Sequence, residues 1–297
     1  KGTCVIMPTL LRYRDSMLVI DPKGENAAVT GRIRRDTLGQ TVHILNPWGE
    51  LAHHYADLGF NAATYNPLDV LDRHDPNVVA IAQNFAATIC PTGKENDPYW
   101  SRSAANILTA VLLWVTDRAE EQKTFARVRE LVTLSRKDFR KACMSGMLKS
   151  MAFDGAIKEM IGQYHGLADV TYGGIASHLV ESTKFLSDPQ IKTSTASSSF
   201  SMQNLLDEYM TVFLVIPHDR VQTHATWLRL VIASATQAIK NRGRTATPRH
   251  HRCMFLIDEF GSIGNMQGLP QDIAIMAGYG LDFTLIAQGL DQLEHHY

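Results

Sequence analysis

Five short, mostly apolar runs are spaced along the chain, and turn-forming or polar residues follow each of them. They cover residues 17–21, 41–45, 211–216, 253–257 and 282–287. Runs of this length with little alternation predict strands buried on both faces, as in parallel sheets. A helical pattern lies between two of them, at residues 223–240, with Gly243 marking its end. This alternation predicts an α/β fold with a mostly parallel sheet.

Helical patterns replace strand patterns in the middle of the chain. Asp97 and Pro98 are an N-cap residue followed by a first-turn proline, and apolar residues then recur on one helical face, at Ile107, Leu108, Val111, Leu112 and Val115. Further helical patterns cover residues 125–134, 137–148, 155–164 and 174–186. We therefore predict an all-α domain at residues 72–201, inserted into an α/β domain formed by residues 1–71 and 202–297.

The composition excludes a general attraction of the whole chain to polyanions. The 297 residues are 45% hydrophobic and 20% charged, as in ordinary globular proteins, and their formal net charge is −1. A nucleic acid would need a local basic patch. The predicted all-α domain holds candidates for one, namely Lys94, Arg102, Arg127, Arg129, Arg136, Lys137, Arg140 and Lys141, with the aromatic residues Tyr99 and Trp100. These residues form either a stacking-plus-phosphate surface for single strands or the solvated faces of amphipathic helices.

Two adjacent carboxylates follow one of the predicted strands. The apolar run 253–257 leads directly into Asp258 and Glu259. The carboxyl ends of strands in an open α/β sheet face the ligand crevice, so both acids are delivered to the place where chemistry occurs. The pattern is that of a Walker B strand. Asp258 would orient Mg²⁺, and Glu259 would polarise the water that attacks the γ-phosphate of ATP.

The first residues of the chain are compatible with the end of a phosphate loop. Such a loop ends in Gly-Lys followed by Ser or Thr and passes into a helix. Lys1 would contact the β- and γ-phosphates. Gly2 stands where the hydroxyl that binds Mg²⁺ is usual, and Thr3 is the alternative ligand. The glycines of such a loop are expected upstream of Lys1.

Polar residues also end two other predicted strands. Asp21 opens a loop that contains Lys23 and Glu25 and is aimed at the crevice. Gln288 ends the last predicted strand, 30 positions after Asp258. An amide at that place can orient the attacking water and report hydrolysis. Together these residues predict a nucleotide site at one edge of the sheet.

The chain resembles the coupling-protein ATPases of type IV secretion and conjugation, of TraG/TraD type, which are relatives of FtsK-like DNA motors. The similarity rests on Lys1-Gly2 with the segment MPTLL at 7–11, VIDPKGEN at 19–26, LIDEFG at 256–261, and Ala287-Gln288 with Gln292-Leu293. It implies a RecA-like P-loop nucleotide-binding domain interrupted by an all-α domain, which uses ATP and Mg²⁺.

The resemblance also implies an assembly and a location. It implies a homo-hexamer that forms the cytoplasmic part of a bacterial inner-membrane protein, with its membrane spans upstream of Lys1. The implied partners are single-stranded DNA with its relaxase, or effector proteins, together with the ATPases and inner-membrane components of the secretion channel. Related motors present an arginine to the neighbouring subunit, but no Arg lies between Asp258 and Gln288. Arg220 and Arg229 are the alternative candidates for that arginine finger.

Two functions from different classes remain open. The first is an ATP-driven subunit, a P-loop ATPase, that recruits relaxase-bound single-stranded DNA or an effector protein and translocates it into the secretion channel. The second is a substrate-receptor platform whose use of nucleotide is weak or only structural. Turnover of Mg-ATP stimulated by single-stranded DNA would favour the first, and tight cargo binding without turnover the second.

Overall fold

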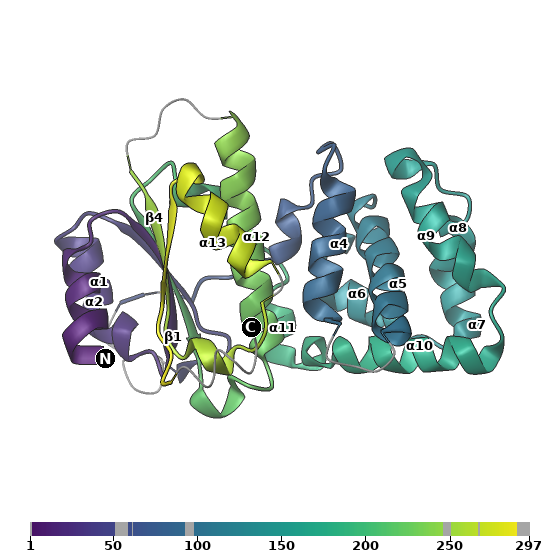
Figure 1. Cartoon of the computed structure of the whole chain (residues 1–297), viewed down its shortest axis with the longest axis horizontal. Helices are drawn as coiled ribbons and strands as arrows, with labels where there is room; N and C mark the ends of the chain where they lie inside the picture. The colour runs from purple at the N-terminus through teal and green to yellow at the C-terminus, as the bar shows by residue number, and fades with distance from the viewer. Residues whose placement is uncertain are drawn as a thin grey trace. The chain divides into compact units, whose positions relative to one another are not determined.

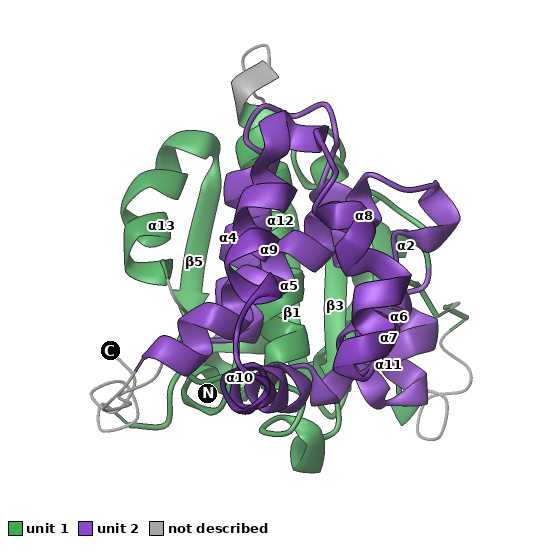
Figure 2. Cartoon of the chain, turned by 90° about the vertical axis from the view of Figure 1, so that its right-hand side faces the viewer, with its two compact units in different colours: residues 1–65, 197–297 green, residues 66–196 purple. Residues whose placement is uncertain are grey.

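The computed structural model describes residues 2–50, 59–60, 62–92, 98–245, 251–266 and 268–289. The chain divides into two compact units, Lys1–Tyr65 with Ser197–Tyr297, and Asn66–Ala196 (Figure 2). These boundaries fall a few residues before the expected ones at 71/72 and 201/202. The side-chain amide of Asn66 donates to the carbonyl of Lys123 at 2.8 Å, which ties residues 66–71 to the helical unit. Ser199 donates its backbone N–H to the carbonyl of Thr64 at 3.0 Å, which ties the return segment to the other unit.

The first unit is built on a five-stranded parallel sheet of order β2-β3-β1-β4-β5. Its strands are β1 (Ser16–Pro22), β2 (Thr41–Leu45), β3 (Met210–Ile216), β4 (Cys253–Ile257) and β5 (Leu281–Leu285). Its helices are η1 (Gly2–Ile6), α1 (Met7–Arg12), α2 (Glu25–Asp36), η8 (Met202–Leu205), η9 (His218–Arg220), α12 (Ala225–Thr245), η10 (Phe260–Ser262), α13 (Leu269–Met276) and η11 (Ala277–Tyr279). The prediction of a mostly parallel α/β sheet is confirmed.

The burial of each strand follows from its place in the sheet. Every residue of β3 is buried, and β1 is buried up to Asp21, because both strands are internal and helices cover both faces. β2 and β5 differ from the prediction of fully buried strands, since both are edge strands among the described residues. Only Ile44 and Leu45 of β2 are buried, and only Leu281 of β5. β5 also ends at Leu285, two residues earlier than predicted.

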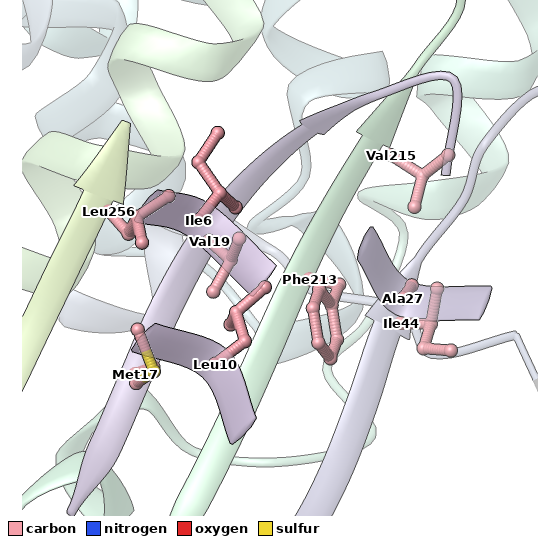
Figure 3. Close-up of a cluster of buried hydrophobic side chains, with 9 residues drawn as sticks. All are labelled: Ile6, Leu10, Met17, Val19, Ala27, Ile44, Phe213, Val215 and Leu256. Carbon is pink, nitrogen blue, oxygen red and sulfur yellow. The ribbon is translucent and has the colours of Figure 1, made fainter. Parts of the chain in front are cut away.

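One face of the sheet forms a continuous core with the N-terminal helices (Figure 3). Register pairs Val19 with both Phe213 and Leu256, so these three side chains lie on the same face. Ile6 and Leu10, from η1 and α1, pack against them. Each such side chain contributes about 1.5–3 kcal/mol when it is buried. Figure 1 shows α1 and α2 on this side of the sheet and α12 and α13 on the other.

The second unit is all-helical in its described part (Figure 2). Its elements are η3 (Pro67–Val70), α4 (Val78–Ile89), α5 (Tyr99–Thr116), η4 (Glu120–Gln122), α6 (Phe125–Val132), α7 (Arg136–Phe139), η5 (Arg140–Met144), α8 (Ser145–Met147), η6 (Ala152–Gly155), α9 (Ala156–His165), α10 (Asp169–Ser182), η7 (Lys184–Ser187) and α11 (Pro189–Ser194). The apolar stripe predicted from Ile107 to Val115 is buried on α5. In α5, Pro98 is the N-cap residue, and Asp97 lies outside the described residues.

Several helix boundaries differ from those predicted. α12 continues through Gly243 to Thr245, because a single glycine costs a helix only about 1 kcal/mol. The predicted helix at 137–148 is divided among α7, η5 and α8. α10 begins at Asp169, five residues before the prediction, through Gly173 and Gly174. At Gly174 an added Cβ would come within 2.6 Å of the ring of Trp100, so the close approach of that ring requires glycine. α13 was not predicted.

Among the residues that the structure describes, no helix combines the length and the apolar character needed to span a bilayer.

Candidate functional site at the carboxyl edge of the sheet

The register of the sheet brings the predicted strand ends together. Ile20 of β1 pairs with Ile257 of β4, and Ile257 in turn pairs with Leu285 of β5. Asp21 and Asp258 each directly follow one of these paired residues, so they lie at the same level of two neighbouring strands. The polar residues on which the sequence prediction depends therefore follow β1, β4 and β5 at the carboxyl edge of the sheet.

Glu259 and Gln288 are in direct contact. The side-chain amide Nε2 of Gln288 donates to the Oε2 atom of Glu259 at 2.7 Å, although 29 positions separate the two residues in the chain. Backbone bonds place the two segments side by side, because Phe260 N–H donates to the carbonyl of Ile286 at 3.0 Å. The amide thus fixes one carboxylate oxygen of Glu259 at the edge of the sheet.

Asp258 shapes the turn that presents Glu259. The backbone N–H of Glu259 donates to Oδ1 of Asp258 at 2.8 Å. Glu259 itself is left-handed, with φ 55° and ψ 37°. A residue other than glycine in this conformation costs about 1–3 kcal/mol, and such strain is concentrated at functional sites. The tight turn directs the Glu259 side chain to the same edge as Gln288.

Asp21 caps α2. Its Oδ1 accepts the N–H of Asn26 at 3.1 Å and its Oδ2 accepts the N–H of Ala27 at 2.7 Å. The N-cap residue of α2 is Gly24, which has no side chain to satisfy these amides, so the strand supplies the carboxylate instead. Asp21 is 0% exposed. This differs from the expectation that Asp21 binds the nucleotide, because both of its oxygens are turned to the helix.

Replacement of Asp21 by Asn is expected to remove a pH dependence of folding stability. Burial raises the pKa of Asp21 from 3.8 to about 7, against the opposing effect of the two amide hydrogen bonds. The folded state therefore retains a proton that the unfolded chain releases, and this group's stabilisation, complete below pH 3.8, is lost as the pH rises through 7. The slope is at most about 1.4 kcal/mol per pH unit.

Urea unfolding of wild type and Asp21→Asn at several pH values between about 4.5 and 8 checks this linkage. Wild type should lose free energy of unfolding relative to the variant as the pH rises. A constant difference between the two proteins would contradict the assignment.

Lys23, in the loop that joins β1 to α2, and Glu25, the first residue of α2, are both exposed at the carboxyl edge. Lys23 has φ 84° and Gly24 has φ 74°, so two successive residues are left-handed. The Lys23 N–H donates to the carbonyl of Ile216 at the end of β3, at 3.2 Å. The loop is thus attached to two neighbouring strands, and its charged side chains remain available to a ligand.

The predicted phosphate-loop residues begin the chain. Lys1 lies outside the described residues. Gly2 starts η1, and an added Cβ there would meet no atom within 4 Å. Thr3 is exposed, with its hydroxyl oxygen 3.7 Å from the sulfur of Cys4. An accessible threonine hydroxyl is suited to bind Mg²⁺, because this ion prefers oxygen donors.

The two candidate arginines have different surroundings. Arg229, on α12, donates through Nη1 to the carbonyl of Ile263 at 2.6 Å and through Nη2 to the hydroxyl of Thr226 at 2.8 Å. It therefore braces the segment that follows β4, and its guanidinium is directed into its own chain. The structure does not favour its predicted role as a finger.

Arg220 lies in η9, beyond the carboxyl end of β3. Its guanidinium carbon is 5.5 Å from the ring centre of Trp48, which follows β2, within the range of a cation–π contact. His224 and Trp227 also pack edge-on against Trp48. Trp48 was missed in the sequence, although its position just after a strand and the Asn46-Pro47 turn is the signal that could have revealed it.

The donor set at this edge fits a divalent cation and a phosphate. Asp258 and Glu259 provide carboxylate oxygens, which are hard ligands suited to Mg²⁺. Both are half-buried, so they are shielded in part from water and still reachable. Lys23, one strand away, provides a cation for phosphate oxygens.

Comparison with known proteins identifies the family. The family described as "Type IV secretory system Conjugative DNA transfer" matches residues 1–297, the whole chain. The chain belongs to this family. It is 27% identical over 304 residues to the conjugal transfer protein TraG of Rhizobium radiobacter, covering 100% of this chain and 45% of that protein. It is 24% identical over 301 residues to the type IV secretion system-coupling protein VirD4 of Bartonella quintana, covering 100% of this chain and 46% of that protein.

A solved structure has the same fold. The plasmid coupling protein TrwB in complex with ADP and Mg²⁺ matches with a TM-score of 0.64 and 18% identity, covering 97% of this chain and 60% of that chain. This likeness confirms the α/β fold with its mostly parallel sheet. The chain spans less than half the length of the curated relatives it matches.

Proposed function

We propose that this chain is the nucleotide-binding and all-α portion of an ATP-driven coupling protein. The contact between Glu259 and Gln288 at the carboxyl edge is the observation that supports it best. A carboxylate and an amide from neighbouring strands are held at one point, where hydrolysis of a triphosphate needs a base and a group that orients water. Its cargo is single-stranded DNA with a bound relaxase, or an effector protein, and it acts in a type IV secretion channel.

Each residue at the carboxyl edge has a separate role in the proposed hydrolysis. Bound Mg²⁺ supplies charge neutralisation at the transferred phosphoryl group. Asp258 orients the ion and holds the turn through its bond to the Glu259 N–H. Glu259 accepts a proton from the attacking water, and the Gln288 amide keeps that carboxylate in place. Lys1, Gly2, Thr3, Lys23 and Glu25 contact the nucleotide, while Asp21 keeps the Lys23 loop in position.

Arg220 is the better of the two candidates for the arginine that reaches a neighbouring copy. Its position just beyond the carboxyl end of β3, beside the Trp48 ring, supports this choice, whereas the guanidinium of Arg229 is bonded to the carbonyl of Ile263. A homo-hexamer with nucleotide between subunits would use it in trans. The assembly would stand on the cytoplasmic side of a bacterial inner membrane, beside the channel ATPases and inner-membrane components.

A second candidate, a receptor platform with weak nucleotide use, is supported by two observations. Gly2 offers no hydroxyl to Mg²⁺, and Arg229 is engaged inside its own chain. Such a platform would bind cargo without turning over ATP.

Addition of single-stranded DNA to the complete protein separates the two candidates. We expect Mg-ATP turnover to rise with DNA concentration and to saturate, because translocation couples hydrolysis to strand binding. Double-stranded DNA of equal phosphate content is the control, and it tests whether stimulation requires a single strand. Tight binding of the strand with no turnover at any concentration would contradict the motor and leave the receptor.

A further inference from the structure

A basic cavity lies within the all-α unit. It has a volume of about 560 Å³ and is lined on one side by Arg136, Lys137 and Arg140. His165 at the end of α9, Gly166 and Leu167 in the loop that follows, and Asp169 at the start of α10 complete the lining. All of these residues belong to the helical unit, and Figure 1 shows α7, α9 and α10 next to one another there. The volume is large enough for a phosphate group together with its sugar.

The positive charge of this cavity is local. Residues 66–196 contain as many basic as acidic residues, yet residues 136–141 carry four basic residues and only Asp138 as an acid. Asp138 is held by Ser135, whose hydroxyl donates to its Oδ2 at 2.6 Å, so it serves the start of α7. The cavity lining itself has three cations and one carboxylate, and it attracts an anion.

Arg136 closes the loop and supports the cavity. It donates to the carbonyl of Leu167 at 2.7 Å, pairs with Asp169, and lies 4.6 Å from the ring of Tyr172. Its Nε atom is buried and has no acceptor among the described residues. Arg136 is therefore engaged with the loop and with Asp169, and it positions the cavity wall instead of contacting the ligand.

Lys137 and Arg140 are the groups left for a ligand. Arg140 donates from Nη2 to the carbonyl of His165 at 3.2 Å, which uses one of the five N–H groups of its guanidinium. In the part of the chain that the structure describes, Lys137 has no acidic partner. Both side chains are exposed. The arginine fork matches the geometry of phosphate oxygens, and the lysine adds a point charge.

We propose that this cavity binds a phosphate of a single-stranded nucleic-acid backbone. The identity of the strand rests on the proposed function. Lys137 and Arg140 contact the phosphate oxygens, and Arg136 keeps the α9–α10 loop in the shape that receives them. The basic residues of this unit therefore have different roles. Arg129 has a structural role, because it is bonded to Ser187, Val180 and Thr183.

Binding of fluorescein-labelled oligo(dT) to the complete protein, followed by anisotropy without nucleotide, tests this site. Lys137→Ala should weaken binding several-fold and reduce the slope of log K against log salt by about 0.7, the value for one lost contact to a single strand. Lys141→Ala is the matched control, because Lys141 is an exposed lysine of the adjoining element η5 and does not line the cavity. Arg140→Lys, which keeps the charge and loses the fork, should weaken binding less than Arg140→Ala.

Inorganic phosphate and polyglutamate serve as competitors in the same assay. Competition by phosphate that disappears in Lys137→Ala supports a phosphate site. Equal affinity of Lys137→Ala and Lys141→Ala for oligo(dT) would overturn the proposal. So would a loss of polyglutamate binding in Lys137→Ala with oligo(dT) binding unchanged, because the cavity would then take an acidic protein segment.

The outcome is distinguishable from failure of the proposed function, because strand binding is measured without ATP. If oligo(dT) binding depends on Lys137 in a protein that never hydrolyses ATP, the proposed phosphate site stands and the ATP-driven function is wrong. If DNA stimulates hydrolysis and Lys137→Ala binds oligo(dT) like wild type, the proposed phosphate site is wrong and the ATP-driven function stands.

Discussion

Replacement of Glu259 by Gln is expected to lower Mg-ATP turnover by about 10²–10⁴-fold and to leave ATP binding nearly unchanged. Glutamine has the same shape and retains an oxygen that can accept the Gln288 Nε2 donor, so the turn after β4 should keep its geometry. It cannot take a proton from the attacking water. The loss is therefore expected in the chemical step, seen as a lower kcat with little change in the dissociation constant of ATP.

Turnover and nucleotide binding of the complete protein check this expectation. The matched control is Glu208→Gln, which makes the same change of charge beside the amino end of β3, away from the strand ends that carry Asp258 and Glu259. Its side chain accepts only a bond from Asn204 among the described contacts, and glutamine can replace it there. Equal turnover of Glu259→Gln and wild type would remove Glu259 from the role of base.

Replacement of Arg34 by Met is expected to destabilise the folded state by about 3–5 kcal/mol. Arg34 is 0% exposed, and all of its described acceptors are neutral oxygens. They are the backbone carbonyls of Leu10, Tyr13 and Asp15 and the side chains of Gln40 and Thr211. Burial lowers the pKa of Arg34 to about 10, so the group stays protonated at neutral pH. Methionine would remove the donor of the three backbone carbonyls, although Gln40 would still accept from the Thr211 hydroxyl.

The effect of Arg34→Met should extend to the N-terminal helices η1 and α1. Arg34 ties the end of α1 to α2 and to β3, and α1 continues the helix that begins at Gly2. Urea unfolding measures the stability, and Arg32→Met on the exposed face of α2 is the control, expected within about 0.5 kcal/mol of wild type. Arg34→Lys, which keeps a charge with fewer donors, should fall between them. Equal stability of Arg34→Met and Arg32→Met would contradict this account.

Strand positions were readable from the chain because the signal is local. The runs at 41–45 and 253–257 coincide with β2 and β4. β4 is an internal strand and needs apolar residues at nearly every position, whereas in the edge strand β2 only Ile44 and Leu45 are buried. Helix ends were less readable. Gly243 lies inside α12, and the 137–148 region is divided among three short elements, because packing outweighs the small propensity differences between residues.

The polar residues at the strand ends were predicted from residue type, but the contacts between them were not. Nothing in the spacing of 29 positions specifies that the Gln288 amide bonds the Glu259 carboxylate, because that contact depends on β4 and β5 being neighbours. The predicted roles of Lys1, Gly2, Thr3 and Glu25 stay predictions. Trp48 gained a role only through the neighbouring strands β2 and β3.

The sequence by itself determined the parallel α/β fold, the helical insertion and the acidic and amide residues at the strand ends, because hydrophobic periodicity and residue chemistry act over a few neighbouring positions. The tertiary structure alone decided which ends meet, that Asp21 faces α2 and that Arg34 and Arg229 are engaged within the fold. These assignments depend on burial and on hydrogen bonds between segments distant in the chain. The free energy of burying a polar group is settled only when its partners are in place.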